Sequence, residues 1–264
     1  MSIKSQRFKG LIMSLGYVLI YFGVTYALQT AFVYWQSRLG IYTTAQLRTN
    51  LTNSQVSLAL ISAIISMWIY MLIGSRRKKP LYREIGEEGV TPAVNIMAVC
   101  LALGMRFLVT VFYVYSQNVQ MLKKSIDDAA ALSPQYTGAF QLLITVFALS
   151  IALPLFEEIL FRGIVMGEYL KFLRPWAAIA LQAVLFGIAH GVLFQSIFTF
   201  GAGVILGIVY YKTRNIRTSA LCHSVFNISV ILAQSQLNTA GMAVFGVAGI
   251  LLTVFPLVYI VKFN

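Results

Sequence analysis

Long apolar runs divide the chain into eight candidate helices that are separated by shorter polar connections. Most runs are roughly 18 to 25 residues long, enough for an α-helix to cross a hydrocarbon core about 30 Å thick. The runs are continuous and do not alternate, so the pattern favours spanning helices over the strands of a membrane barrel. The predicted helices occupy residues 11–35, 56–74, 93–116, 138–160, 176–190, 194–211, 218–236 and 240–261.

Composition supports this interpretation and excludes several classes of protein. Of the 264 residues, 59% are hydrophobic and only 11% are charged, whereas charged residues make up about a quarter of an ordinary soluble domain. We find no internal repeat, low-complexity tract or linker that would indicate a second folded unit. The sequence therefore predicts an all-α polytopic membrane helix bundle of about eight transmembrane helices, with residues 1–264 forming a single integral membrane domain.

The net charge of +12 comes from 20 Lys and Arg against 8 Asp and Glu. The basic residues concentrate in connections between the apolar runs, which favours a role in membrane orientation over binding of nucleic acid. Four of them, Arg38, Arg48, Lys123 and Lys124, lie in connections on one predicted side, and most others lie opposite. We expect a multi-pass protein of the plasma membrane, and the positive-inside rule predicts that both termini lie in the cytoplasm.

Polar residues also mark the longer connections. Residues 36–55 and 117–137 are rich in Ser, Thr, Asn and Gln, and we expect them to be solvated loops on the outer side. Within the apolar runs, Gln141, Gln182 and Gln195 are expected to form hydrogen bonds between helices.

Two adjacent acidic residues, Glu157 and Glu158, lie inside an apolar run, where an ionisable group usually faces a protein interior or a polar cavity. Arg162 follows Glu158 by four residues, the favourable spacing for an ion pair within one helix. A helix turns about 100° per residue, so Glu157 points to a different sector and retains a free carboxylate. Such a group can act as a general base. The alternative is that both glutamates only connect helices.

The two histidines of the chain also lie in apolar runs. Phe186 precedes His190 by four residues, and Asn227 follows His223 by four, so each pair shares one helix face. Together with Glu157, these side chains supply a base, proton carriers and hydrogen-bond donors for an oxyanion. The combination favours catalysis or metal binding over packing alone.

The polar residues occur in four short motifs whose order and helix placement resemble a known family. The motifs are Glu157-Glu158-x-x-x-Arg162, Phe186-x-x-x-His190, Phe200-x-x-Gly203-x-x-x-Gly207 and His223-x-x-x-Asn227. They resemble those of the CPBP family of intramembrane proteases, which comprises CAAX prenyl endopeptidases of type II and bacteriocin-processing proteins. The resemblance covers roughly residues 138–236, expected to form the catalytic core.

This resemblance implies hydrolysis of a peptide bond in or beside the bilayer. Glu157 matches the glutamate that activates water, assisted by His190, while His223 and Asn227 match residues proposed to stabilise the oxyanion. Glu158 and Arg162 match positions that hold the site in shape, in agreement with their predicted ion pair.

Two further motif positions, Gly203 and Gly207, are four residues apart and are expected to be packing positions, because small residues let helices approach closely.

Metal dependence is a separate question, because two histidines and a carboxylate can form a catalytic zinc site with one position left for water. Glu157, His190 and His223 would be the ligands. The chain contains no His-Glu-x-x-His sequence. We therefore expect that no cofactor is required and that the reaction is independent of metal, with zinc as the alternative.

The sequence thus predicts an intramembrane endopeptidase that cleaves a membrane-associated protein or peptide. The main alternative is a noncatalytic membrane scaffold or regulator that binds a cell-envelope enzyme or sensor protein. A proton-coupled transporter that uses Glu157 and His190 as a relay is a further alternative, although the chain shows no paired inverted repeats.

Overall fold

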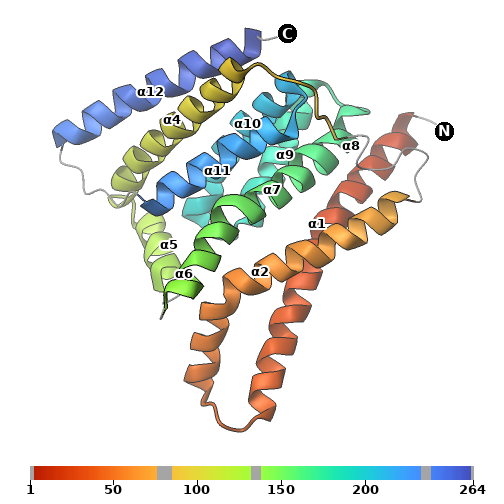
Figure 1. The fold of residues 1–264 in the computed structure, drawn as a ribbon, viewed down its shortest axis with the longest axis vertical. Helices are drawn as coiled ribbons and strands as arrows, with labels where there is room; N and C mark the ends of the chain where they lie inside the picture. Colours follow the sequence, from red (N-terminus) through yellow and green to blue (C-terminus); the bar gives the residue numbers. More distant parts are fainter. Residues whose placement is uncertain (1–2, 76–84, 132–137, 233–238, 263–264) are drawn as a thin grey trace.

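The fold is all-α, as predicted, in a computed structural model that describes residues 3–75, 85–131, 138–232 and 239–262 (Figure 1). The α-helices are α1 (Ile3–Arg38), α2 (Thr44–Ser75), α4 (Pro92–Ser116), α5 (Gln120–Ala131), α6 (Ala139–Phe147), α7 (Leu153–Glu158), α8 (Gly167–Leu170), α9 (Pro175–Ala189), α10 (Leu193–Thr213), α11 (Ile216–Leu232) and α12 (Thr239–Lys262). Each of the eight predicted segments lies largely in helix.

Six helical segments among the described residues are long and apolar enough to cross a membrane. They are α1, α2, α4, the continuous segment from α6 to α8, α10 and α12. The other two predicted helices are shorter, because α9 has 15 residues and α11 has 17. The chain is therefore a multi-pass membrane protein in which two short helices complete the bundle.

The segment from α6 to α8 is one helical course that contains two wider, π-helical stretches. These are η1 (Ala148–Ala152) and η2 (Ile159–Met166), and they stand on either side of α7, which carries Glu157 and Glu158. The prediction ended this helix at residue 160, but it continues to Leu170. The prediction was too short because Arg162 is neutralised by Glu158 and so does not end the helix.

Two segments that were expected to be loops are mostly helical. The α2 helix already begins at Thr44, and α5 occupies much of the connection before α6. Hydropathy does not report such polar helices, since Ala, Gln, Leu and Lys favour helix whether or not they are buried. The α5 helix is held against the start of α10, where the Phe194 backbone N–H donates to Ser125 Oγ at 3.1 Å.

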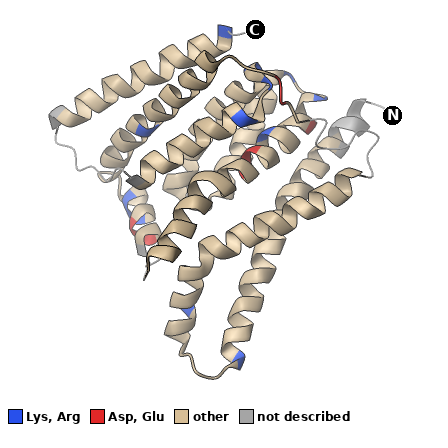
Figure 2. Ribbon diagram, viewed as in Figure 1, with Lys and Arg blue, Asp and Glu red and all other residues tan. Residues whose placement is uncertain are grey.

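The helices are arranged so that α7 and α11 run through the middle of the bundle (Figure 1). On one side of this centre, α4 packs against both α11 and α12, and on the other, α1 and α2 form a long hairpin. The α9 and α10 helices pack closely against each other. Figure 2 shows mostly uncharged helices with charges near several helix ends, and an acidic group within the bundle on α7.

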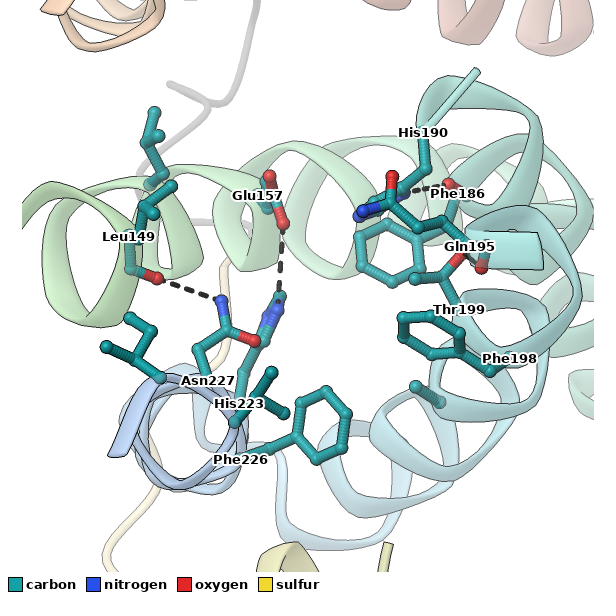
Figure 3. A pocket seen from close by; sticks show the side chains of 14 residues that line it. Leu149, Glu157, Phe186, His190, Gln195, Phe198, Thr199, His223, Phe226 and Asn227 are labelled. Atoms are coloured by element: carbon teal, nitrogen blue, oxygen red, sulfur yellow. Dashed lines mark hydrogen bonds and ion pairs between the residues drawn. The ribbon is translucent and has the colours of Figure 1, made fainter. Parts of the chain in front are cut away.

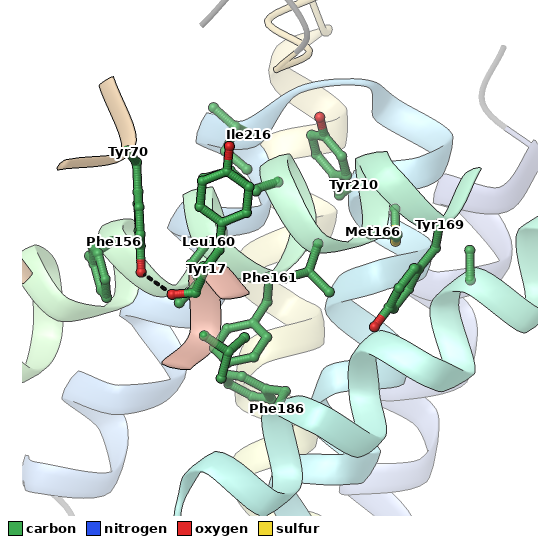
Figure 4. Packing of buried hydrophobic residues seen from close by; sticks show 14 of the residues in the cluster. Tyr17, Tyr70, Phe156, Leu160, Phe161, Met166, Tyr169, Phe186, Tyr210 and Ile216 are labelled. Atoms are coloured by element: carbon green, nitrogen blue, oxygen red, sulfur yellow. Dashed lines mark hydrogen bonds between the residues drawn. The ribbon is translucent and has the colours of Figure 1, made fainter. Parts of the chain in front are cut away.

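A buried apolar cluster joins the hairpin to the centre of the bundle (Figure 4). Phe156 and Leu160 pack in this cluster with Tyr17 from α1 and Tyr70 from α2. The Tyr70 hydroxyl donates to the Tyr17 carbonyl at 2.5 Å, so the polar end of this buried ring is satisfied. The cluster thereby holds α1 and α2 against the helix that carries the two glutamates.

Glycines allow close approach where α10 meets α9, as the sequence predicted. A Cβ atom added at Gly207 would lie 2.7 Å from Gln182 Nε2, and one at Gly203 would lie 3.1 Å from the Ala183 Cα. A side chain at either position would therefore crowd α9, so the two glycines suit the close approach of the helices. The prediction that both glycines are packing positions is confirmed.

Candidate active site

A cavity of about 320 Å³ lies between η1, α7, α10 and α11, with the end of α9 at its edge (Figure 3). All four predicted catalytic residues, Glu157, His190, His223 and Asn227, line this cavity. The remaining lining residues are mainly apolar: Leu149, Leu153, Phe186, Gln195, Phe198, Thr199, Ala202, Phe226, Val230 and Ile231. Residues from separate parts of the sequence therefore converge on one cavity, as a catalytic site requires.

The two adjacent glutamates have different surroundings, as their helical spacing predicted. The Glu158 side chain is fully buried, whereas the Glu157 side chain is 25% exposed and reaches the cavity. Of the two carboxylates, only Glu157 can therefore meet a water molecule or a substrate.

The buried Glu158 carboxylate connects three side chains. Its Oε1 atom forms an ion pair with Arg162 Nη1 at 2.8 Å and accepts from His223 Nδ1 at 2.9 Å, while Oε2 accepts from Ser219 Oγ at 2.5 Å. The predicted ion pair with Arg162 is confirmed. The two contacts with α11 extend the prediction, since they join Glu158 directly to the helix that carries His223.

Arg162 extends this network toward α9 and α10. Its Nη2 atom lies 3.4 Å from the Gly203 carbonyl, which also accepts from Gln182 Nε2 at 2.7 Å. Its guanidinium carbon lies 4.4 Å from the centre of the Phe186 ring, within range of a cation–π interaction. The Glu158–Arg162 pair thus contacts every helix that contributes a catalytic candidate.

His223 lies between the two glutamates. Its Nδ1 atom must carry a hydrogen, because the Glu158 carboxylate at 2.9 Å can only accept. Its Nε2 atom lies 3.7 Å from Glu157 Oε2 (Figure 3). The imidazole is therefore fixed on one side by a buried carboxylate and faces Glu157 on the other.

His190 stands at the end of α9, on the opposite side of the cavity from Asn227 (Figure 3). Its Nδ1 atom donates to the Phe186 carbonyl at 2.8 Å, which leaves Nε2 free to act. Among the described residues, no hydrogen bond or ion pair joins His190 to Glu157, so their partnership stays a prediction.

Asn227 is anchored by its amide nitrogen. Nδ2 donates to the Leu149 carbonyl in η1 at 2.9 Å, and the side chain borders the cavity (Figure 3). Because this nitrogen carries two hydrogens, one is left for another acceptor.

The predicted zinc ligands do not form a compact donor set. In the described part of the chain, no group of three or more His, Cys, Asp or Glu side chains is placed to hold a metal ion. Glu157 and His223 are neighbours, but His190 lies across the cavity. This arrangement does not fit a three-ligand site.

Sequence reasoning assigned Gln195 wrongly. We expected a hydrogen bond between helices, as Gln141 makes with the Asn53 carbonyl at 3.3 Å and Gln182 makes with Gly203. Gln195 instead lines the cavity, and its carboxamide has no hydrogen-bond partner among the described residues. Its position in the first turn of α10, five residues after His190, was the only sequence signal for this role.

Comparisons with known proteins agree with the motifs. Residues 139–229 match the family model described as type II CAAX prenyl endopeptidase Rce1-like. The chain is 25% identical over 194 residues to the membrane-embedded CAAX protease MroQ of Staphylococcus aureus (strain USA300), a match that covers 70% of this chain and 76% of that protein. No solved structure matches.

The fold and the site together describe a polytopic membrane protein in which two histidines and a glutamate line one cavity in the helix bundle. The family model and MroQ agree with the four motifs, because all three show similarity between this chain and the CAAX proteases. The matched residues, 139–229, fall within the segment 138–236 that the motifs indicated.

Proposed function

We propose that the protein is an intramembrane endopeptidase that hydrolyses a peptide bond of a membrane-associated protein or peptide. The observation that carries this proposal is the convergence of Glu157, His190, His223 and Asn227 on one cavity, with a buried ion pair behind them. The mainly apolar lining suits a peptide segment that arrives from the bilayer.

In this mechanism Glu157 accepts a proton from water while the water oxygen attacks the carbonyl carbon of the scissile bond. Negative charge then develops on the carbonyl oxygen, where two donors are available. These are the second Asn227 Nδ2 hydrogen and the Nε2 hydrogen of a protonated His223, whose ring lies between two carboxylates. Each such donor lowers the barrier by about 3 kcal/mol.

The intermediate then collapses with cleavage of the carbon–nitrogen bond, and the proton taken from water is returned to the leaving amine. His190 assists on the other side of the cavity. Its Nδ1 hydrogen is held by Phe186, so Nε2 can receive and return a proton during this transfer.

We further propose that the enzyme lies in the plasma membrane with both termini in the cytoplasm and needs no resident metal. The distribution of Lys and Arg supports the orientation. Reporter domains fused to the C-terminus test this orientation. Activity of a reporter enzyme that functions only outside the cytoplasm would contradict it. The scattered donor set supports the absence of a metal.

The test compares wild type, Glu157→Gln and Glu87→Gln in cells that lack the native gene. Glu87 is the matched control, because it is an exposed glutamate that pairs with Arg217 at 3.2 Å, away from the cavity. We expect that wild type and Glu87→Gln restore the wild-type cell-envelope phenotype and that Glu157→Gln does not. Cells with Glu157→Gln should also accumulate uncleaved membrane peptides, although all three proteins are equally abundant.

Two outcomes would change the proposal. Full function of Glu157→Gln would favour the noncatalytic scaffold that binds a cell-envelope enzyme or sensor protein. If the purified protein lost activity on treatment with a zinc chelator and regained it with added zinc, the metal-dependent mechanism would replace the metal-independent one.

A further inference from the structure

The helix that carries the glutamates changes its hydrogen bonding just before them. The Leu153 N–H donates to the Ala148 carbonyl, five residues back, where an α-helix would use a carbonyl four residues back. The next residue, Pro154, has no N–H, and its ring clashes with the carbonyl four residues earlier in an ordinary helix. A widened π-helical turn relieves this clash, which accounts for η1.

This change leaves one backbone carbonyl, that of Leu149, without its usual donor. In an α-helix the Leu153 N–H would serve it, but that group donates to Ala148. In a continued π-helix residue 154 would serve it, but proline has no N–H. An unsatisfied carbonyl is unfavourable within a membrane, so this atom needs a partner from elsewhere.

Asn227 is that partner. Its Nδ2 atom donates to the Leu149 carbonyl at 2.9 Å, across the contact between η1 and α11. Both residues line the cavity, and Figure 3 shows the amide held between this carbonyl and the cavity. The bond therefore sets where the remaining amide hydrogen points.

We infer that Pro154 is a positioning residue that acts on Asn227 through the Leu149 carbonyl. By withholding a backbone donor, the proline keeps this carbonyl available as an anchor for the amide. The inference rests on the proposed function only for its catalytic consequence. The anchor itself can be measured without any substrate.

Replacing Pro154 with alanine supplies the missing N–H and allows the helix to satisfy its own carbonyls. We expect Pro154→Ala to lower kcat about tenfold with little change in KM, since a displaced oxyanion donor affects mainly the transition state. The matched control is Pro256→Ala, which removes a proline inside α12, away from the cavity.

A double-mutant cycle with Asn227→Ala distinguishes positioning from a general effect on the fold. If Pro154 acts through Asn227, Pro154→Ala lowers kcat no further once the amide is gone. In the Asn227→Ala variant the Leu149 carbonyl has lost its side-chain donor. The backbone N–H introduced by Pro154→Ala then lets the helix satisfy this carbonyl itself. Pro154→Ala therefore raises the melting temperature more in Asn227→Ala than in wild type, whereas Pro256→Ala has the same effect in both.

Nuclear magnetic resonance of the Asn227 side-chain amide, assigned by its loss in Asn227→Asp, gives a readout that needs no activity. We expect the two hydrogen signals to move in Pro154→Ala and to stay in place in Pro256→Ala. Unchanged signals, or equal effects of Pro154→Ala on melting temperature in both backgrounds, would overturn the inference. Inactive wild-type protein with the expected amide shifts would instead contradict the proposed function and leave the anchor intact.

Discussion

The α4–α12 contact and the α7–α11 contact hold the bundle together in different ways. Between α4 and α12 the helices approach through small residues, and a Cβ atom at Gly104 would lie 2.6 Å from the Leu252 carbonyl carbon. Between α7 and α11 the contact is polar, because Glu158 bonds both Ser219 and His223.

The first contact therefore contributes to stability alone, whereas the second also positions the residues of the candidate active site. Lipid is as apolar as leucine, so helices in a membrane associate through close packing and hydrogen bonds. The α4–α12 contact relies on close packing and needs no ionisable group. The α7–α11 contact relies on hydrogen bonds, which also fix the side chains that face the cavity. Substitutions in the two contacts should therefore have different consequences.

The largest effect on stability is expected from Glu158→Gln, which leaves Arg162 as an uncompensated charge at a site with no exposed surface. Breaking one partner of a buried pair destabilises a protein by about 3 to 5 kcal/mol. Unfolding in detergent measures this change. Glu87→Gln, which breaks an exposed pair, should change stability by less than about 1 kcal/mol. Equal stability of the two variants would show that the α7–α11 network does not hold the bundle.

A smaller loss of stability is expected from Gly104→Ala, because the new methyl group would force α4 away from α12. Overpacking of this kind destabilises a protein by about 1 to 3 kcal/mol. Gly246→Ala is the control on α12 itself, since a Cβ atom there meets nothing within 4 Å. Both variants should keep wild-type kcat in the folded fraction. A selective loss of kcat in Gly104→Ala would show that the two contacts are coupled.

The smallest effect is expected from Gln195→Ala. The carboxamide has no hydrogen-bond partner in the described part of the chain and borders the cavity, so its removal leaves no buried group unsatisfied. If it binds the substrate backbone, KM should rise about fivefold, the equivalent of one net hydrogen bond, with kcat unchanged. Gln141→Ala should instead lower stability without changing KM, because Gln141 bonds α2. Unchanged KM in Gln195→Ala would exclude that contact.

The sequence predicted most features that depend on local spacing. Apolar runs located eight helical segments, and the i to i+4 spacing predicted the Glu158–Arg162 pair. Spacing cannot show which helices meet, so the bond between Glu158 and His223 was not predicted. The same limit explains Gln195, because its sequence does not distinguish a bond to another helix from a position at a cavity.

Two errors have a more local cause. Hydropathy measures transfer to lipid and not helix formation, so it did not predict the polar helix α5. Pro154 was visible in the sequence, but its effect on the Leu149 carbonyl depends on which carbonyl accepts from Leu153. The donor that serves this carbonyl, Asn227, lies on α11, and local spacing does not show that the two segments meet.

The α1–α2 hairpin is much longer than a bilayer is thick. With 36 and 32 residues, its helices measure about 54 and 48 Å at a rise of 1.5 Å per residue, against about 30 Å of hydrocarbon. Such helices must tilt steeply or extend beyond the headgroups, and either arrangement carries Arg38 and Arg48 out of the hydrocarbon. A thinner or thicker membrane should therefore change the inclination of this hairpin before it disturbs the packed centre. Because Tyr17 and Tyr70 pack against Phe156 on α7, such a change in inclination would be transmitted to the helix that carries Glu157.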